Sequence, residues 1–279
     1  MSSPDSPASE LARDRPNVVD FAKVTKRFGS RTVIRDVTFS VADLPGKGEF
    51  IAILGPSGCG KSTVLRLIAG LRPHYPASEG TVHVLGKPVD SPGSDRGMVF
   101  QDYTSFDNRT VEDNVAFGLE CRGVAVRERR ERAREWIAKV GLDVKRDATK
   151  YPSELSGGMR QRVAIARTLI LSPRIILMDE PFGALDPTTR LHMQALLVDL
   201  WKEAEATVFF VTHSIDEAIY LGDRVYVFSS APGTIIREMT VPPPDRPPKE
   251  MLREPGFVER VCEIRDIMDT MASSTRAGD

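Results

Sequence analysis

The alternation of apolar and polar residues along the chain indicates two kinds of β-strand. Within residues 18–42, Val37, Phe39 and Val41 alternate with polar neighbours, which is typical of a sheet with one buried face. Three later runs are continuously apolar, at residues 50–54, 175–178 and 208–211. Strands that are buried on both faces of a parallel sheet have this composition. Because helical stretches separate these runs, we expect an α/β fold with crossover helices in the middle of the chain.

One helical stretch, residues 127–140, is unusually charged. Nine of its fourteen residues are Arg, Lys or Glu, with Glu128–Arg132 and Glu135–Lys139 at i,i+4 spacing. Its apolar stripe consists of Ala133, Trp136, Ile137 and Val140. A nucleic-acid patch and a solvated helix face are the two alternatives, and the interleaving of Arg with Glu favours the solvated face.

The two ends of the chain differ in composition from its middle. Residues 1–16 hold three prolines and few large apolar side chains, so we expect a disordered lead. Residues 242–248 (PPPDRPP) predict a stiff spacer, and weak helical periodicity follows over residues 254–271. The expected organisation is a lead (1–16), one main domain (17–241), and a proline-rich spacer with a short helical tail (242–279).

Composition excludes several classes of protein. The 279 residues carry 38 Lys and Arg against 39 Asp and Glu, a balance that argues against binding a polyanion by bulk charge. Three widely spaced cysteines indicate neither a disulfide framework nor a zinc cluster. No apolar run approaches the ~18 residues of a membrane span, and the N-terminal residues lack the apolar core of a secretory signal. We therefore expect a protein of a reducing, cytosolic compartment.

Residues 55–63 (GPSGCGKST) fit the phosphate-binding pattern G-x-x-x-x-G-K-[ST], after an apolar strand and before a helix that ends at Gly70. The glycines allow successive backbone N–H groups to face one anion, and the helix start adds a partial positive charge. Lys61 is expected to reach the terminal phosphates, and the Ser62 hydroxyl to bind Mg²⁺. The expected nucleotide contacts are Gly55, Pro56, Ser57, Gly58, Cys59, Gly60, Lys61, Ser62 and Thr63.

Cys59 lies within this loop, where thiolates tend to be stabilised. A redox-sensitive thiol is one interpretation. A small residue that only presents its backbone N–H is the favoured one.

Two adjacent carboxylates, Asp179 and Glu180, end the apolar run 175–178. Successive strand residues point to opposite sides, so the two acids are expected to differ in role. One can hold the Mg²⁺ shell while the other faces the γ-phosphate and its attacking water.

A second potential anion site begins with Leu-Ser-Gly-Gly at residues 155–158, at the start of a helix. One chain with two such sites suggests a dimer in which Ser156, Gly157 and Gly158 of one copy cap the nucleotide of the other.

The phosphate loop, LSGGMRQR (155–162), IILMDEP (175–181) and Val-Thr-His (211–213) together resemble the ATP-binding subunit of an ABC transporter over about residues 18–240. The resemblance implies an α/β P-loop NTPase that binds ATP and Mg²⁺. Its core sheet would be mixed or parallel, with an antiparallel β subdomain at the N-terminus and an inserted α-helical subdomain at about residues 103–170.

The resemblance also assigns individual residues. Glu180 corresponds to the general base, His213 to the switch histidine on the γ-phosphate, and Gln101 to the glutamine that senses Mg²⁺ and contacts the membrane partner. Asp186 lies in the loop exchanged across the dimer. Phe28 has the position of the aromatic that stacks on adenine, with an ordinary strand-end aromatic as the alternative. The magnesium ligands implied are Ser62, Gln101 and Asp179.

Three segments are similar to importers of the nitrate, sulfonate and taurine class: residues 97–106, 179–190 and 211–229. The implied partners are a second copy, an integral membrane permease and, indirectly, a solute-binding protein, with no nucleic acid; the implied location is peripheral, at the cytoplasmic face of the cell membrane. Relatives often carry Pro-Trp where this chain has Asp107-Asn108, in a stretch that resembles the groove receiving the permease's coupling helix.

The alternative to an import subunit is a soluble ABC-type ATPase acting on translation or DNA. Such proteins usually have two cassettes, long coiled coils or zinc insertions, which this sequence lacks.

Overall fold

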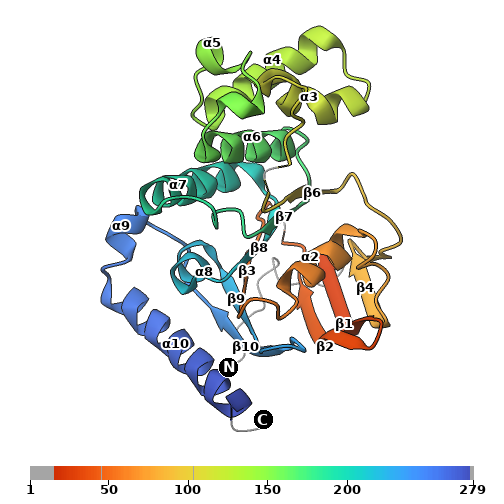
Figure 1. Cartoon of the computed structure of the whole chain (residues 1–279), viewed down its shortest axis with the longest axis vertical. Helices are drawn as coiled ribbons and strands as arrows, with labels where there is room; N and C mark the ends of the chain where they lie inside the picture. The colour runs from red at the N-terminus through yellow and green to blue at the C-terminus, as the bar shows by residue number, and fades with distance from the viewer. Residues whose placement is uncertain (1–15, 45, 103, 277–279) are drawn as a thin grey trace, which may run out of the picture.

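The chain forms two β-sheets flanked by helices, with a group of helices extending from one end of the molecule (Figure 1). The structure is a computed structural model and describes residues 16–44, 46–102 and 104–276. The lead expected at residues 1–16 falls, apart from Pro16, outside the described residues.

The smaller sheet is antiparallel, with the strand order β2-β1-β4-β5. Its strands are β1 (Val19–Phe28), β2 (Arg31–Val41), β4 (Glu79–Val84) and β5 (Lys87–Pro88). On β2, Val37, Phe39 and Val41 are buried while Thr38 and Ser40 are exposed, which confirms the predicted alternation.

The larger sheet has the order β10-β9-β3-β8-β7-β6, and only β10 is antiparallel to its neighbour. Its strands are β3 (Phe50–Leu54), β6 (Arg96–Val99), β7 (Ile175–Asp179), β8 (Thr207–Thr212), β9 (Arg224–Phe228) and β10 (Ile235–Thr240). All residues of β3, β7 and β8 are buried, as their continuous apolar runs predict. The predicted α/β fold, with a mixed core sheet and an antiparallel subdomain, is confirmed.

The strand register brings three loops to one edge of this sheet. Leu54 at the end of β3 pairs with Thr212 at the end of β8, and Val211 pairs with Asp179 at the end of β7. Because parallel strands end on the same side, the residues that follow β3, β7 and β8 are neighbours.

Helices cover this sheet and build the extension at the top of Figure 1. Those next to the sheet are α2 (Lys61–Ala69), α7 (Pro187–Ala204) and α8 (Ile215–Leu221). The extension contains α3 (Val111–Cys121), α4 (Val126–Lys139), α5 (Val144–Asp147), the 3-10 turn η1 (Pro152–Glu154) and α6 (Gly157–Leu169). Buried residues of α3, α4 and α6 form one apolar cluster with those of the larger sheet.

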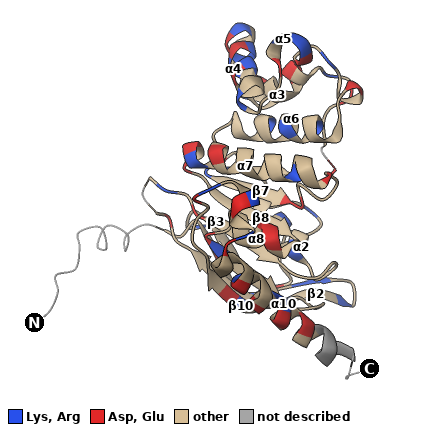
Figure 2. Ribbon diagram, turned by 90° about the vertical axis from the view of Figure 1, so that its left-hand side faces the viewer, with Lys and Arg blue, Asp and Glu red and all other residues tan. Residues whose placement is uncertain are grey.

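The charged helix α4 has a buried stripe and an exposed face on which both charge signs alternate (Figure 2). Glu128 pairs with Arg132 at 3.9 Å, as the spacing predicts. The predicted pairing of Lys139 with Glu135 is wrong, because Lys139 Nζ instead lies 2.7 Å from Glu203 Oε2 on α7. The mixed charges support the solvated face rather than a nucleic-acid patch.

The C-terminal segment folds back over the larger sheet's helices. After α9 (Pro248–Met251), helix α10 (Pro255–Arg276) packs against α8 through the buried side chains of Phe257, Val261 and Ile264. None of the helices in the described part of the chain is long and apolar enough to span a bilayer.

The Asn114 side chain fixes the segment that leads into α3. It is fully buried; its Oδ1 accepts a hydrogen bond from the Phe106 N–H at 2.8 Å, and its Nδ2 donates to the carbonyls of Phe106, Arg109 and Thr110, each at 3.0 Å. One amide therefore satisfies most of this turn's inward polar groups.

We expect Asn114→Ala to lower the free energy of unfolding by about 2–4 kcal/mol, because several buried backbone groups lose their partner. Urea unfolding followed by circular dichroism measures this. The control is Asn108→Ala at an exposed position of the same segment, with an expected change within about 0.5 kcal/mol. Equal midpoints for the two variants would contradict this role of Asn114.

Candidate active site

The loop between β3 and α2 is shaped for an anion. Gly58 and Gly60 adopt φ of 77° and 102°, and a Cβ on Gly60 would lie 2.5 Å from Ile34 Cγ2, so only glycine fits there. Gly60 is the N-cap of α2, and no side chain caps this helix. Its first N–H groups and its partial positive charge therefore face the loop.

Lys61 begins α2 and is held inside the loop. Its side chain is only 4% exposed, and Nζ donates to the carbonyls of Gly55 at 2.8 Å and Pro56 at 3.0 Å. Glu180 Oε1 lies 3.9 Å away. The ammonium group thus lies among the backbone groups of the phosphate loop.

Ser62 connects this loop to the end of β7. Its hydroxyl donates to Asp179 Oδ1 at 2.7 Å, and Asp179 is 3% exposed. Burial raises the pKa of Asp179, while the Ser62 hydrogen bond and the nearby Arg66 act to lower it. A hydroxyl and a carboxylate side by side are the hard oxygen ligands that suit Mg²⁺.

Arg66 was not anticipated from the sequence. Its Nη2 lies 3.7 Å from Asp179 Oδ2. The signal was available, because Arg66 follows Ser62 by four residues and therefore lies on the same face of α2.

Glu180 and His213 form the other half of the site. His213 follows β8, and its Nδ1 lies 3.1 Å from Glu180 Oε2. Glu180 has a left-handed backbone conformation, with φ of 45°, immediately after β7. The two adjacent carboxylates thus have different partners, as expected, but the left-handed backbone of Glu180 after the end of β7, rather than strand alternation, accompanies the change: Asp179 contacts Ser62, and Glu180 contacts His213.

Phe28, at the end of β1, packs edge-on against His74, with ring centroids 5.2 Å apart, and lies 5.1 Å from Lys26 Nζ. Arg66 Nη1 lies 3.3 Å from His74 Nε2. Through His74 and Arg66, the partly exposed Phe28 ring is connected to Asp179 at the phosphate loop.

Cys59 is buried, and burial raises the pKa of its thiol, against the lowering effect of Lys61 and of backbone N–H groups. Desolvation outweighs the partial charge of the helix, and the structure favours the interpretation of a small residue that presents its backbone.

The remaining predicted site residues lie apart from the phosphate loop. Ser156 is the exposed N-cap of α6, and Asp186 is the exposed N-cap of α7. A Cβ on Gly158 would lie 2.8 Å from Thr189 Cγ2, so these two helix starts are adjacent. In the described part of the chain, no hydrogen bond or ion pair joins Ser156, Gly157 or Gly158 to the phosphate loop, or Gln101 to Ser62 or Asp179.

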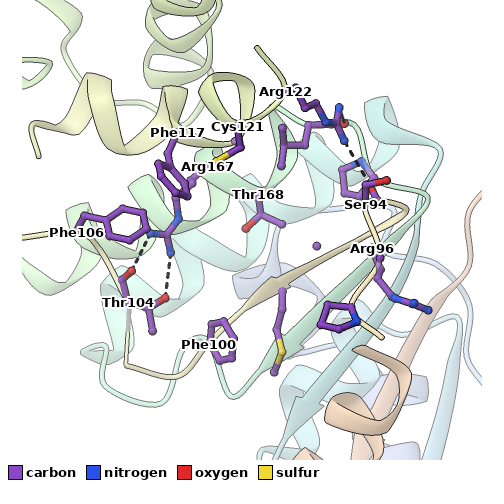
Figure 3. Close-up of a pocket in the computed structure, with 17 residues that line it drawn as sticks. Ser94, Arg96, Phe100, Thr104, Phe106, Phe117, Cys121, Arg122, Arg167 and Thr168 are labelled. Carbon is purple, nitrogen blue, oxygen red and sulfur yellow. Dashed lines mark hydrogen bonds between the residues drawn. The ribbon is translucent and has the colours of Figure 1, made fainter. Parts of the chain in front are cut away.

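A groove of about 830 Å³ opens between β6 and the helices α3 and α6 (Figure 3). Its lining is mostly apolar, and Arg167 is its most constrained polar group. Arg167 donates to Thr104 O at 2.7 Å and to Thr104 Oγ1 at 3.0 Å, and its guanidinium lies 5.5 Å from the centre of the Phe106 ring. This groove adjoins the exposed Asp107 and Asn108, where the sequence departs from its relatives' pattern.

Comparison with known proteins agrees with this geometry. The sequence profile of a family described as ABC transporter matches residues 35–183. The nitrate import ATP-binding protein NrtD of Synechocystis sp. is 48% identical over 227 residues, which are 79% of this chain and 84% of that protein. The taurine import ATP-binding protein TauB of Rhizobium johnstonii is 46% identical over 259 residues, 91% of this chain and 90% of that protein.

Among solved structures, the dimeric post-hydrolysis state of the ATP-binding cassette MJ0796, bound to ADP and Pi, superposes with a TM-score of 0.69 at 34% identity. The match covers 80% of this chain and 99% of that one. Together with the family match over more than half of its length, these similarities show that the chain belongs to the ABC transporter family.

Proposed function

We propose that this chain is the ATP-binding and ATP-hydrolysing subunit of an import system that moves a small anion, of the nitrate or taurine kind, through a separate permease. The observation that carries the ATPase role is the gathering of Lys61, Ser62, Asp179, Glu180 and His213 at one edge of the larger sheet. The similarity to the nitrate import protein NrtD and the taurine import protein TauB supports import and the class of solute.

In this proposal, the phosphates of ATP lie in the loop of residues 55–63, against the uncapped start of α2. Lys61 exchanges its bonds to the loop carbonyls for the terminal phosphates. Ser62 and Asp179, with Gln101, would hold Mg²⁺, which neutralises charge on the β- and γ-phosphates. The ring of Phe28 stacks on adenine, although an ordinary strand-end aromatic remains the alternative.

Glu180 is the proposed general base. Its carboxylate would accept the proton of a water molecule that attacks the γ-phosphorus in line, while the bond from that phosphorus to the bridging oxygen breaks and ADP leaves. The contact between His213 Nδ1 and Glu180 Oε2 orients both side chains, and it leaves His213 Nε2 to face the γ-phosphate.

The active unit is proposed to be a dimer of this chain. Ser156, Gly157, Gly158 and Asp186 of one copy would cap the nucleotide bound by the other. Two features support this: within the described residues, no hydrogen bond or ion pair joins these groups to the phosphate loop of their own chain, and the MJ0796 cassette is described as dimeric.

The permease is proposed to dock in the groove beside Arg167 and Phe106, which places the chain at the cytoplasmic face of the membrane as a peripheral subunit. The groove's apolar lining suits a helix end. A solute-binding protein would act on the far side of the permease. Residues 17–241 would form the ATPase domain, with the helical subdomain at about 103–170 and the tail at 242–279.

We expect Glu180→Gln to keep ATP binding and to lose about 10²–10⁴-fold in turnover, because the amide cannot accept the water's proton. Phosphate release and binding of a fluorescent ATP analogue measure the two effects. The control is Glu203→Gln, which removes only an exposed ion pair with Lys139. Near-normal turnover in Glu180→Gln would rule out this base.

We expect a mixture of Ser156→Arg chains and Lys61→Ala chains to recover activity that neither has alone. In the mixed dimer, one composite site combines the intact Lys61 of one chain with the intact Ser156 of the other. Equal mixing gives at most about a quarter of wild-type turnover per chain, since half of the dimers are mixed and each has one intact site. Failure of the mixture to exceed the separate variants would contradict the shared site.

We expect the chain, expressed with its permease, to co-purify from detergent-solubilised membranes rather than with ribosomes. Phe106→Asp should weaken this association while leaving basal ATP hydrolysis unchanged, because a charge would enter the apolar groove. Tyr151→Asp is the matched control, since Tyr151 is an exposed aromatic outside the groove. Recovery of the chain with ribosomes would instead favour the soluble alternative.

A further inference from the structure

Glu217 is a buried carboxylate in α8 that none of the roles above uses. It is 6% exposed, and it lies between the loop that carries His213 and the helix that follows Asp186. Burying a carboxylate is costly unless it is hydrogen-bonded and paired, so its partners indicate what it is for.

Glu217 is hydrogen-bonded to both residues that flank His213 in the sequence. The Thr212 hydroxyl donates to Glu217 Oε2 at 2.6 Å, and the same hydroxyl oxygen accepts from the Ser214 N–H at 3.0 Å. Ser214 Oγ in turn accepts from the Glu217 N–H at 3.3 Å. The backbone on each side of the switch histidine is therefore fixed through one carboxylate.

The hydrogen bonds between Thr212, Ser214 and Glu217 are a variant of the capping box, a common pattern at the first turn of a helix. In a capping box, Ser-x-x-Glu, the glutamate bonds back to the N–H of the N-cap residue. Here that N–H, of Ser214, bonds to the Thr212 hydroxyl, and the hydroxyl proton bonds to Glu217 Oε2. The other carboxylate oxygen, Oε1, is consequently free to face α7.

On the α7 side, the partner of Glu217 is Arg190, four residues after Asp186. Arg190 Nη2 donates to the carbonyl of Leu185, in the loop next to Asp186, at 3.0 Å. Its Nε lies 3.7 Å from Glu217 Oε1, too far for a hydrogen bond, and this buried nitrogen has no other acceptor in the described part of the chain. Burial raises the pKa of Glu217, while the Thr212 hydroxyl, Arg190 and Gln194, one turn further along α7, act to lower it.

Glu217 is thus hydrogen-bonded to the residues that flank His213, whereas on the side of Asp186 it lies beyond hydrogen-bond distance of Arg190. A pocket of about 230 Å³, lined by Arg190 and Gln194 of α7 and by Pro248 and Leu252 of the tail, leaves room for Arg190 to shift. A shift of well under 1 Å would bring Arg190 Nε to hydrogen-bond distance.

We propose, resting on the ATPase function above, that Glu217 is a positioning residue that makes the placement of His213 depend on the loop around Asp186. When a second copy engages Asp186, the start of α7 moves Arg190 onto Glu217. The carboxylate then holds Thr212 and Ser214 so that His213 faces the γ-phosphate. Hydrolysis is thereby tied to closure of the dimer.

Two sets of variants test the two halves of this connection. Glu217→Gln keeps an acceptor for Thr212 but removes the charge that faces Arg190, and Arg190→Met removes the other partner. Thr212→Val removes the hydroxyl at nearly constant volume, whereas Thr212→Ser retains it. Glu112→Gln is the matched control, because Glu112 is a buried carboxylate paired with Arg134 in the helical subdomain.

We expect Glu217→Gln, Arg190→Met and Thr212→Val each to lower kcat about tenfold, with the KM for ATP and the affinity for a fluorescent ATP analogue unchanged. The double variant Glu217→Gln, Arg190→Met should be no slower than the slower single variant, because both break one connection. Thr212→Ser should retain most of the wild-type kcat. Glu112→Gln should lower the melting temperature without lowering kcat.

An unchanged kcat in Glu217→Gln would overturn the proposal. So would losses that multiply in the double variant, or a fall in kcat that Thr212→Ser shares with Thr212→Val. A fall in kcat accompanied by an equal fall in nucleotide affinity would show a merely structural role. Absence of ATP hydrolysis in the unmodified chain would instead refute the proposed function, and the two failures are therefore distinguishable.

Discussion

The parallel pairing of β3, β8 and β7 is the constraint on which the site depends. Register places Leu54 beside Thr212 and Val211 beside Asp179, so the phosphate loop, the loop that carries His213 and the two carboxylates start from adjacent points of one rigid edge. The three strands are buried on both faces, and their ends therefore cannot move independently without opening the apolar core. Ser62 and Asp179 can meet at 2.7 Å, 117 residues apart in sequence, because the sheet fixes both ends.

Much of this edge could be predicted from the sequence, since each part has a local signal. The glycine spacing around Lys61 determines the loop, and the apolar run before Asp179 determines a buried strand. That Asp179 and Glu180 differ in partner was also expected, although Glu180 lies just after β7 with a left-handed backbone and does not follow the strand's alternation. Arg66 also had a local signal, its i,i+4 spacing from Ser62.

Other parts were beyond sequence reasoning because they depend on which elements meet. Lys139 was expected to pair within its own helix, but packing of α4 beside α7 brings Glu203 closer. For Cys59 the sequence left two interpretations open, and only the fold shows that the thiol is buried, which raises its pKa. The contact between Glu217 and Arg190 likewise depends on the packing of α8 beside α7. Local patterns specify what a residue can do, and tertiary contacts decide which option is used.

A common physical feature links the proposed chemistry to the proposed dimer. Lys61 satisfies its charge with the carbonyls of Gly55 and Pro56, while Arg190 leaves its Nε without an acceptor. A phosphate group would give the Lys61 ammonium an anionic partner, and a small shift of α7 would bring an acceptor within reach of Arg190 Nε. A ligand shifts an equilibrium only by its differential affinity for two states. In the proposed closed dimer, groups that are better paired than in the separate chain would supply that difference, so ATP binding and closure would favour each other before any bond is broken.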